Sequence, residues 1–341
     1  MRVRIGLLAL LLALPGAAPA LAQVAAPRLT PLFIGLPAIS SAFNPALDPV
    51  NPAAQMWAGS SFVGAGVTTQ GHNEQANLGT VTSRGNLDTR LAQLRLMGDF
   101  VSLGATLGHT RYRLKDTLGP NDIQFDVIDT RIELALRYTD WLALGVARQA
   151  SREHVRTGVP PDEDVRRTEL QLPGASLHFG VLYLGYASGS EELRIEGAAG
   201  VPGVVGATER DRRSVNRTGV GLRDRGDTWG YHLEVYREER EAFQFLVTYP
   251  GYVIDEIHLS GSTVEVIAWN VLLGFEKSRT DNRQSVGGIP ANFTSDAVRA
   301  SIGWVPRSGM TLLATGQRGR RLTNASVGQV EALMVSVGWS F

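Results

Sequence analysis

The sequence predicts an all-β protein, a transmembrane antiparallel β-barrel of about 14 strands with an N-terminal plug segment in its lumen. Three observations lead to this prediction. Apolar and polar residues alternate with a period of two over most of the chain. The connections between these stretches are alternately short and long, and the final stretch alternates up to an aromatic last residue, Phe341. A count of about 12 strands is the alternative if the poorly alternating region 243–262 is misread.

The N-terminal residues predict export from the cytoplasm. Arg2 and Arg4 give a positive start, residues 5–14 are apolar, and Ala20-Leu21-Ala22 matches the small-residue pattern of a cleavage site. We therefore expect residues 1–22 to be a signal peptide that is removed before Gln23. A membrane anchor is the alternative, but a spanning helix needs roughly 20 apolar residues and this run is shorter.

Composition excludes several classes of site. The chain contains no Cys, which excludes a lipid-modified cysteine, disulfides and cysteine metal sites. It carries 33 basic and 33 acidic residues, so its charge gives no reason to expect binding to nucleic acid. We expect no cofactor and no metal ion.

Residues 23–55 differ from the rest because they are rich in Pro and Ala and do not alternate. They contain the tripeptide Asn-Pro-Ala twice, as Asn44-Pro45-Ala46 and as Asn51-Pro52-Ala53. Pro fixes its own φ and keeps the preceding Asn out of the helical region, while the Asn side chain can bond back to the nearby backbone. Two compact turns of this kind suggest a folded plug, and a flexible periplasmic leader is the alternative.

Residues 56–341 are predicted to form the barrel. The stretch 123–138 alternates most clearly, and a short turn at Thr139-Asp140 leads into 141–156. Region 263–279 is expected to be one long strand after a turn at Gly261, with Trp269 packed in its middle. The other stretches expected to be strands are 56–69, 87–97, 100–115, 165–178, 181–195, 213–222, 228–241, 253–259, 293–305, 310–321 and 327–341.

Charged residues recur at even spacing on the two clearest strands. We expect them to form a polar ladder in the lumen, which either braces a narrow interior or selects a solute by constriction; the bracing role is favoured. The residues of this predicted ladder are Asp129, Arg131, Glu133, Arg137, Arg148 and Arg152.

The last strand carries large apolar residues at every second position, which are Val335, Val337, Trp339 and Phe341. A strand of this kind resembles the C-terminal recognition strand of Gram-negative outer-membrane β-barrels. The resemblance implies a location in the cell outer membrane, recognition by the barrel assembly machinery, and contact with membrane lipid and lipopolysaccharide.

The segment Asn51-Pro52-Ala53, which leads through Met56-Trp57 into a Gly- and Ser-rich strand, resembles the N-terminal segment of the FadL/TodX long-chain fatty-acid and hydrocarbon transport family. The resemblance implies a 14-stranded barrel whose plug moves to let apolar ligands leave through an opening in the wall. This chain is short for that family, and its predicted outer loops are brief.

We therefore expect passive transport of a small hydrophobic or amphipathic molecule, gated by the plug. The alternatives are a lipid-modifying enzyme and a structural or adhesive barrel with a closed lumen. Catalysis is disfavoured, because the six His residues are scattered and no recognised catalytic motif accompanies them.

Overall fold

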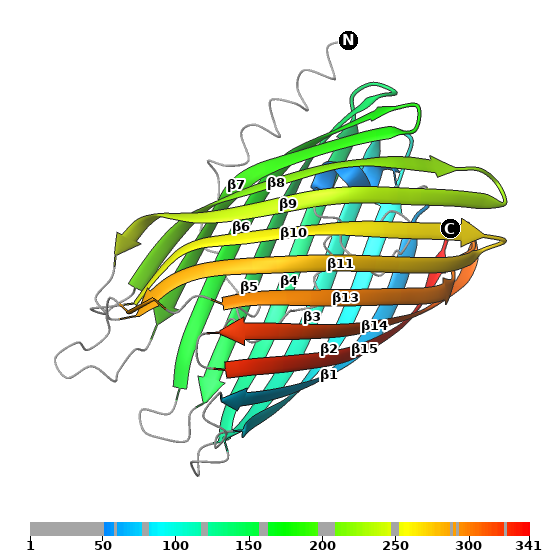
Figure 1. The fold of residues 1–341 in the computed structure, drawn as a ribbon. Helices are drawn as coiled ribbons and strands as arrows, with labels where there is room; N and C mark the ends of the chain where they lie inside the picture. The colour runs from blue at the N-terminus through cyan, green and yellow to red at the C-terminus, as the bar shows by residue number, and fades with distance from the viewer. Residues whose placement is uncertain are drawn as a thin grey trace.

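The computed structural model describes residues 51–57, 60–76, 82–116, 122–156, 163–196, 209–246, 252–286, 289–290, 293–323 and 326–341. They form one antiparallel sheet that closes into a barrel of 14 long strands (Figure 1). Each long strand pairs with its neighbours in sequence, β1 pairs with β15, and the two-residue strand β12 pairs only with β11. The predicted antiparallel barrel and its strand number are confirmed.

The strands are β1 (Phe62–Ala76), β2 (Thr82–Met97), β3 (Val101–Asp116), β4 (Asp122–Arg137), β5 (Leu142–Arg156), β6 (Glu163–Phe179), β7 (Leu182–Glu196), β8 (Glu209–Arg225), β9 (Trp229–Leu246), β10 (Tyr252–Ala268), β11 (Val271–Val286), β12 (Ile289–Pro290), β13 (Phe293–Trp304), β14 (Gly309–Thr323) and β15 (Ser326–Ser340). A short 3-10 helix, η2 (Pro52–Trp57), precedes them. Residues 56 and 57, expected in the first strand, therefore end this helix, and β1 begins at Phe62. No helix among the described residues is long and apolar enough to span a membrane.

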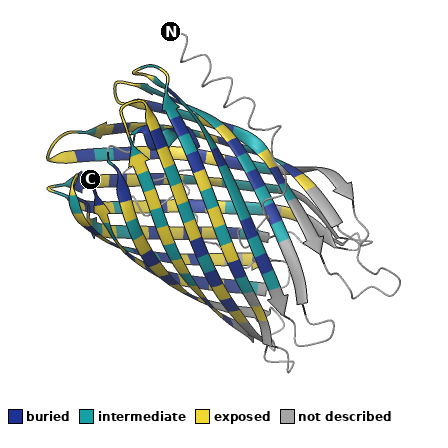
Figure 2. Ribbon diagram, turned by 180° about the vertical axis from the view of Figure 1, so that it is seen from behind, coloured by how far each residue is buried: buried dark blue, intermediate teal, exposed yellow. Residues whose placement is uncertain are grey.

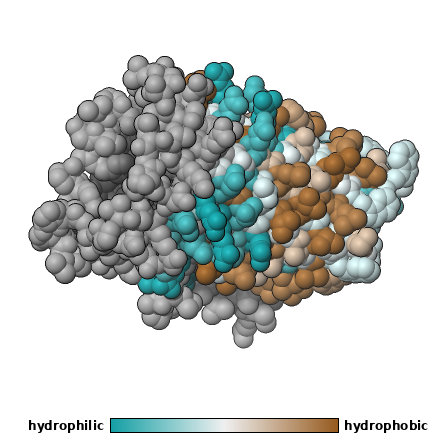
Figure 3. All heavy atoms as spheres, turned by 90° about the horizontal axis from the view of Figure 1, so that it is seen from below, coloured by the Kyte–Doolittle hydropathy of each residue, from teal (hydrophilic) through white to brown (hydrophobic). Residues whose placement is uncertain are grey.

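The two faces of the sheet differ in the way a lipid-embedded barrel requires. In β15, Val335 and Val337 are about half exposed on the outer face, while Met334 and Ser336 between them are buried on the inner face. Figure 2 shows the same alternation of buried and exposed residues along neighbouring strands. The outer apolar side chains gather into a band bordered by hydrophilic residues (Figure 3). Such a band suits lipid, and the polar inner face suits a watery lumen.

One end of the barrel carries the short turns, and we call it the turn end. Five of the six Trp residues are exposed there, and Trp141 stacks on Phe179 with ring centroids 5.4 Å apart. Amphipathic rings collect where the hydrocarbon of a membrane meets its headgroups. The five are Trp141, Trp229, Trp269, Trp304 and Trp339. The opposite end, where the longer connections lie, is the loop end.

The predicted single strand 263–279 is wrong. The chain turns at Trp269-Asn270, between β10 and β11, with φ of 47° and 69° at these two residues. This is a two-residue hairpin turn made without Gly, and Asn is one of the few other residues that enter this region easily. Trp269 is therefore in a turn and highly exposed, not packed in a strand.

The predicted turn at Gly261 is also wrong. Gly261 lies inside β10, directly opposite Tyr236 of β9. A Cβ at this position would collide with the Tyr236 ring, so the glycine makes room for a large neighbour and does not bend the chain.

Candidate functional site

The candidate site is the lumen at the turn end, where η2 lies against the inner wall. Ala53 and Met56 are fully buried and pack with Ala135 of β4 and Ala143 of β5. Trp57 packs against the same cluster. The helix contacts β4, β5 and β6 most extensively. Small inward residues on those strands leave a recess that the helix fills.

Two glycines complete this recess. A Cβ on Gly145 would lie 2.6 Å from the backbone nitrogen of Ala53, and one on Gly174 would collide with the Asn51 side chain. Any larger residue at either place would push the helix off the wall. We call the surface formed by Ala135, Ala143, Gly145 and Gly174 the wall recess.

Asn51 holds the start of the helix in two ways. Its Oδ1 accepts a hydrogen bond from the Ala53 N–H at 3.0 Å, which forms the local turn expected of an Asn before Pro. Its Nδ2 donates to the carbonyl of Ala175 at 2.6 Å and to that of Tyr186 at 3.4 Å. One side chain therefore both shapes the segment and attaches it to β6 and β7.

Two arginines hold the end of the helix. Arg137 donates to the carbonyl of Met56 at 3.3 Å and lies 5.2 Å from the centre of the Trp57 ring, while Arg223 donates to the carbonyl of Trp57. The final carbonyls of a helix lack partners within the helix and carry partial negative charge, so cations are favourable there. Trp57 in turn donates its Nε1–H to Ser176 at 2.8 Å.

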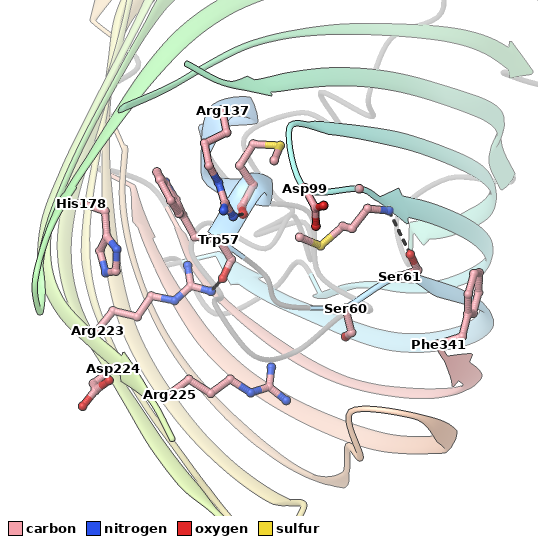
Figure 4. A pocket seen from close by; sticks show the side chains of 13 residues that line it. Trp57, Ser60, Ser61, Asp99, Arg137, His178, Arg223, Asp224, Arg225 and Phe341 are labelled. Atoms are coloured by element: carbon pink, nitrogen blue, oxygen red, sulfur yellow. Dashed lines mark hydrogen bonds between the residues drawn. The ribbon is translucent and has the colours of Figure 1, made fainter. Parts of the chain in front are cut away.

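A cavity of about 470 Å³ opens beside the end of the helix. Figure 4 shows Trp57, Arg137 and Arg223 around it, with Phe341 at its far side. Apolar and charged groups line it together, which suits a guest with an apolar body and a polar end. Its lining residues are Met56, Trp57, Ser60, Ser61, Met97, Gly98, Asp99, Arg137, His178, Arg223, Asp224, Arg225 and Phe341.

Ion pairs cross-link the inner face farther along the barrel. Glu238 of β9 accepts hydrogen bonds from Arg217 of β8 and from Arg240, and Arg240 reaches Glu191 of β7 at 3.2 Å. Buried charges are tolerated when paired in this way. The network joins three strands and keeps this part of the lumen polar.

A second network lies on the neighbouring wall. Glu276 of β11 accepts from the Tyr236 hydroxyl at 2.8 Å and from Arg299 of β13 at 3.0 Å, and Arg299 also donates to Gln317 of β14 at 3.3 Å. Nearer the turn end, His232 lies between Glu234 and Glu265, at 3.0 and 3.4 Å. Among the described residues no cluster of His, Asp or Glu could hold a metal ion.

Sequence reasoning did not single out these networks, nor Arg223, Ser176 and Gly145 around the helix. A signal was present in β9, where every second residue from His232 to Arg240 is polar or aromatic and can form hydrogen bonds. That spacing indicates a lumen face, but it does not identify the partners on other strands.

The structure places only part of the predicted plug motif. Asn51, Pro52 and Ala53 lie in the lumen as described above. The other copy, Asn44, Pro45 and Ala46, lies outside the described residues, as does the rest of the segment 23–50.

Four residues of the predicted polar ladder share the inner face of β4. Arg131 donates to Glu133 at 2.6 Å, Asp129 accepts from Ser151 of β5, and Arg137 holds the helix. They do not form one continuous ladder: Arg131 and Glu133 pair with each other, while Asp129 contacts Ser151 and Arg137 contacts the helix.

Arg148 and Arg152 are not in the lumen, and that part of the prediction is wrong. Arg148 is paired in register with Ile132 and Arg152 with Ile128, two of the exposed apolar residues on the outside of β4. Side chains directly opposite one another share a face of the sheet. Successive side chains of a strand point to opposite faces, and both arginines lie an even number of residues from Leu144, which belongs to the outer apolar band. They therefore share its outer face.

The apolar residues of the last strand lie outside as expected. Val335, Val337, Trp339 and Phe341 are all exposed at about half of their surface. The Phe341 backbone exchanges two hydrogen bonds with Ser61, just before β1, so the last strand also completes the seam of the barrel.

Comparison of the structure with solved proteins gives several barrels that overlap most of the chain. A Pseudomonas aeruginosa FadL homologue matches with a TM-score of 0.54 at 12% identity, over 85% of this chain and 92% of that one. The CymD monoaromatic hydrocarbon channel matches with a TM-score of 0.53 at 10% identity, over 86% of this chain and 91% of that one. The Pseudomonas putida toluene transporter TodX matches with a TM-score of 0.52 at 11% identity, over 84% and 91%.

The chain has the fold of the FadL-type barrels. No protein-family model and no curated protein sequence matches it. The resemblance drawn from a few residues around Asn51 is thus confirmed for the FadL-type fold, although identities of 10 to 12% leave little of it in the sequence.

Proposed function

We propose that this protein is an outer-membrane barrel that passively transports a small hydrophobic or amphipathic molecule, and that its N-terminal segment gates the lumen. In this orientation the turn end faces the periplasm and the loop end faces outward. The observation that carries the proposal is the position of η2, which lies in the lumen and borders the cavity at the turn end.

The character of the attachment supports a gate. The helix packs on a small apolar cluster, and a few hydrogen bonds from Asn51, Trp57, Arg137 and Arg223 fix its ends. Most of these contacts join separate elements through side chains, so they can break without disturbing the pairing of the barrel strands. The matching structures include a toluene transporter and a monoaromatic hydrocarbon channel, which suggests single-ring hydrocarbons as first substrates to test.

Uptake into liposomes tests the proposal. Purified barrel is reconstituted, and entry of radiolabelled toluene and ethylbenzene into an internal trap is followed without an ion gradient. We expect uptake above that of empty liposomes, and a several-fold faster rate after deletion of residues 23–54 or in Arg223→Gln, because both weaken the gate. Arg307→Gln, an exposed turn-end residue bonded to Gly226 and Asp227, is the matched control and should behave as wild type.

Each negative outcome has a defined meaning. No uptake by either the full chain or the deletion variant would overturn transport of these compounds and favour a structural barrel, whose lumen is braced by the ion-pair networks described above. Equal uptake by both would leave transport standing and reject the gate. Hydrolysis of phospholipid or lipopolysaccharide during the assay would favour the lipid-modifying alternative.

A further inference from the structure

A patch of buried apolar side chains lies on the lumen side of the wall, next to the wall recess and on its loop-end side. In β5, Ala147 follows Gly145 by two residues, and in β6, Leu172 precedes Gly174 by two residues, so both face the lumen as the glycines do. Ala147 and Leu172 are directly opposite one another. We call the cluster to which they belong the lumen patch; its members are Ala147, Leu170, Leu172, Ala187 and Val215.

Charged residues border the lumen patch on both flanks. Glu133 of β4 is directly opposite Ala147, and Arg217 of β8 is directly opposite Ala187, so these side chains share the inner face with the patch. Arg131, the partner of Glu133, interacts electrostatically with Arg217 although β5, β6 and β7 lie between their strands. Because β4 and β8 are about 19 Å apart along the wall, the charged side chains of the two flanks extend toward one another over the patch.

The charges around the patch are paired with one another. Arg131 donates to Glu133 at 2.6 Å. The other pairs are Arg217 with Glu238 and Arg240 with Glu191. Breaking a buried ion pair by removing one partner is strongly destabilising. A charged guest would have to displace one of these partners, whereas a neutral guest leaves all the pairs intact.

We propose that the lumen patch binds the transported molecule, and that this molecule is a neutral hydrocarbon with one aromatic ring. The patch is continuous with the wall recess, so a molecule bound there lies against the wall beside the start of η2. Ala147 and Ala187 have the smallest side chains of the patch, and the room that they leave determines how large a ring enters beneath the charged side chains. The inference rests on the proposed transport function and names residues that determine its specificity.

Binding of toluene to the full chain in detergent micelles tests the site directly. Alanine is labelled with ¹³C at its methyl group, and the methyl signals are recorded with and without toluene. We expect the signals of Ala147 and Ala187 to shift, because an aromatic ring changes the magnetic field at the methyl groups that it contacts. The matched control is Ala332, which is also buried but lies on β15, halfway round the barrel from β7, and its signal should stay unchanged.

Side-chain size at the patch tests the selectivity. Ala187→Leu should weaken toluene binding at least about tenfold, since one extra methylene group in an apolar site changes binding by that much or more. Leu172→Ala should shift the preference from toluene toward the larger mesitylene. Ala332→Leu makes the same change of size on the opposite wall and should bind toluene as the wild type does. Migration on a gel before and after boiling verifies that each variant is a folded barrel.

Benzoate, which carries the same ring with a carboxylate, tests the preference for neutral molecules. It should bind at least about tenfold more weakly than toluene, because its charge would have to disrupt a buried ion pair. Benzoate bound as tightly as toluene would overturn this preference.

The binding site itself has its own counter-result. Unchanged signals of Ala147 and Ala187 at saturating toluene, or an equal shift at Ala332, would overturn the assignment of the lumen patch. Toluene that shifts the two patch signals but does not enter liposomes would remove the transport proposal and leave the binding site standing. The two failures can therefore be told apart.

Discussion

At the scale of single residues, Asn51 illustrates how one side chain can serve two purposes. Its carbonyl oxygen closes the turn that begins η2, and its amide nitrogen attaches that turn to two strands of the wall. On the barrel wall, Gly174 has no side chain and therefore leaves the space that the Asn51 amide occupies. The match between an Asn on the segment and a Gly on the barrel is why this tripeptide is informative at so short a length.

Substitution of Asn51 separates these two roles. In Asn51→Ala the helix loses both, so amide exchange of residues 53–57 should quicken by roughly 30-fold, as expected for about 2 kcal/mol of lost hydrogen bonding. Asn51→Asp keeps the acceptor that closes the turn but loses the donor. If attachment to the wall dominates, Asp should exchange as fast as Ala; protection of the Ala variant at the wild-type level would contradict the assignment.

At the scale of elements, turns were harder to locate from the sequence than strands. The short connections near Gly98, Thr139 and Gly180 were predicted because small and polar residues interrupt the alternation there. Trp269-Asn270 contains no Gly or Pro, and Trp269 extends the apolar run Val266-Ile267-Ala268, so the sequence does not mark a turn there clearly. The chain turns there because both residues take positive φ, which is a property of backbone geometry that periodicity does not report.

The turn between β10 and β11 requires a positive φ at Asn270, where φ is 69°. Asn270→Ala should lower the free energy of unfolding by about 1 kcal/mol, because Ala enters this region at a steric cost of that size. Asn270→Gly is the matched control and should be neutral or slightly stabilising. Guanidinium unfolding in detergent micelles measures both, and an Ala variant as stable as the Gly variant would argue against this turn.

At the scale of the whole molecule, alternation sufficed to predict a closed barrel of the observed strand number, because lipid outside and water inside impose one period on every strand. It did not suffice to predict which polar residues face the lumen. Outside the apolar band both faces become polar, so Arg148 and Arg152 look like lumen residues. Only their even spacing from Leu144, which faces outward, shows that they lie on the outer face. The partners of Glu238 and Arg299 depend on three-dimensional register and could not be predicted at all.

The bracing of the barrel depends on charges that are paired across strands. Glu238→Gln should remove the carboxylate shared by the buried Arg217 and the partly exposed Arg240, and lower the free energy of unfolding by about 3 kcal/mol or more. Glu239→Gln changes the adjacent residue of β9, which faces outward and pairs with Arg237, and should cost less than about 1 kcal/mol. Equal stability of the two variants in detergent micelles would show that the inner network is not a brace.

The wall recess has a consequence for how the lumen would open. The helix packs closely against Ala135, Ala143, Gly145 and Gly174. Departure of the helix would therefore uncover an apolar hollow lined by small residues. If the proposed gate operates, an apolar ligand and the helix would compete for this hollow, and a bound ligand would keep the helix out. The ligand itself would then hold the lumen open, and the barrel wall would not have to move.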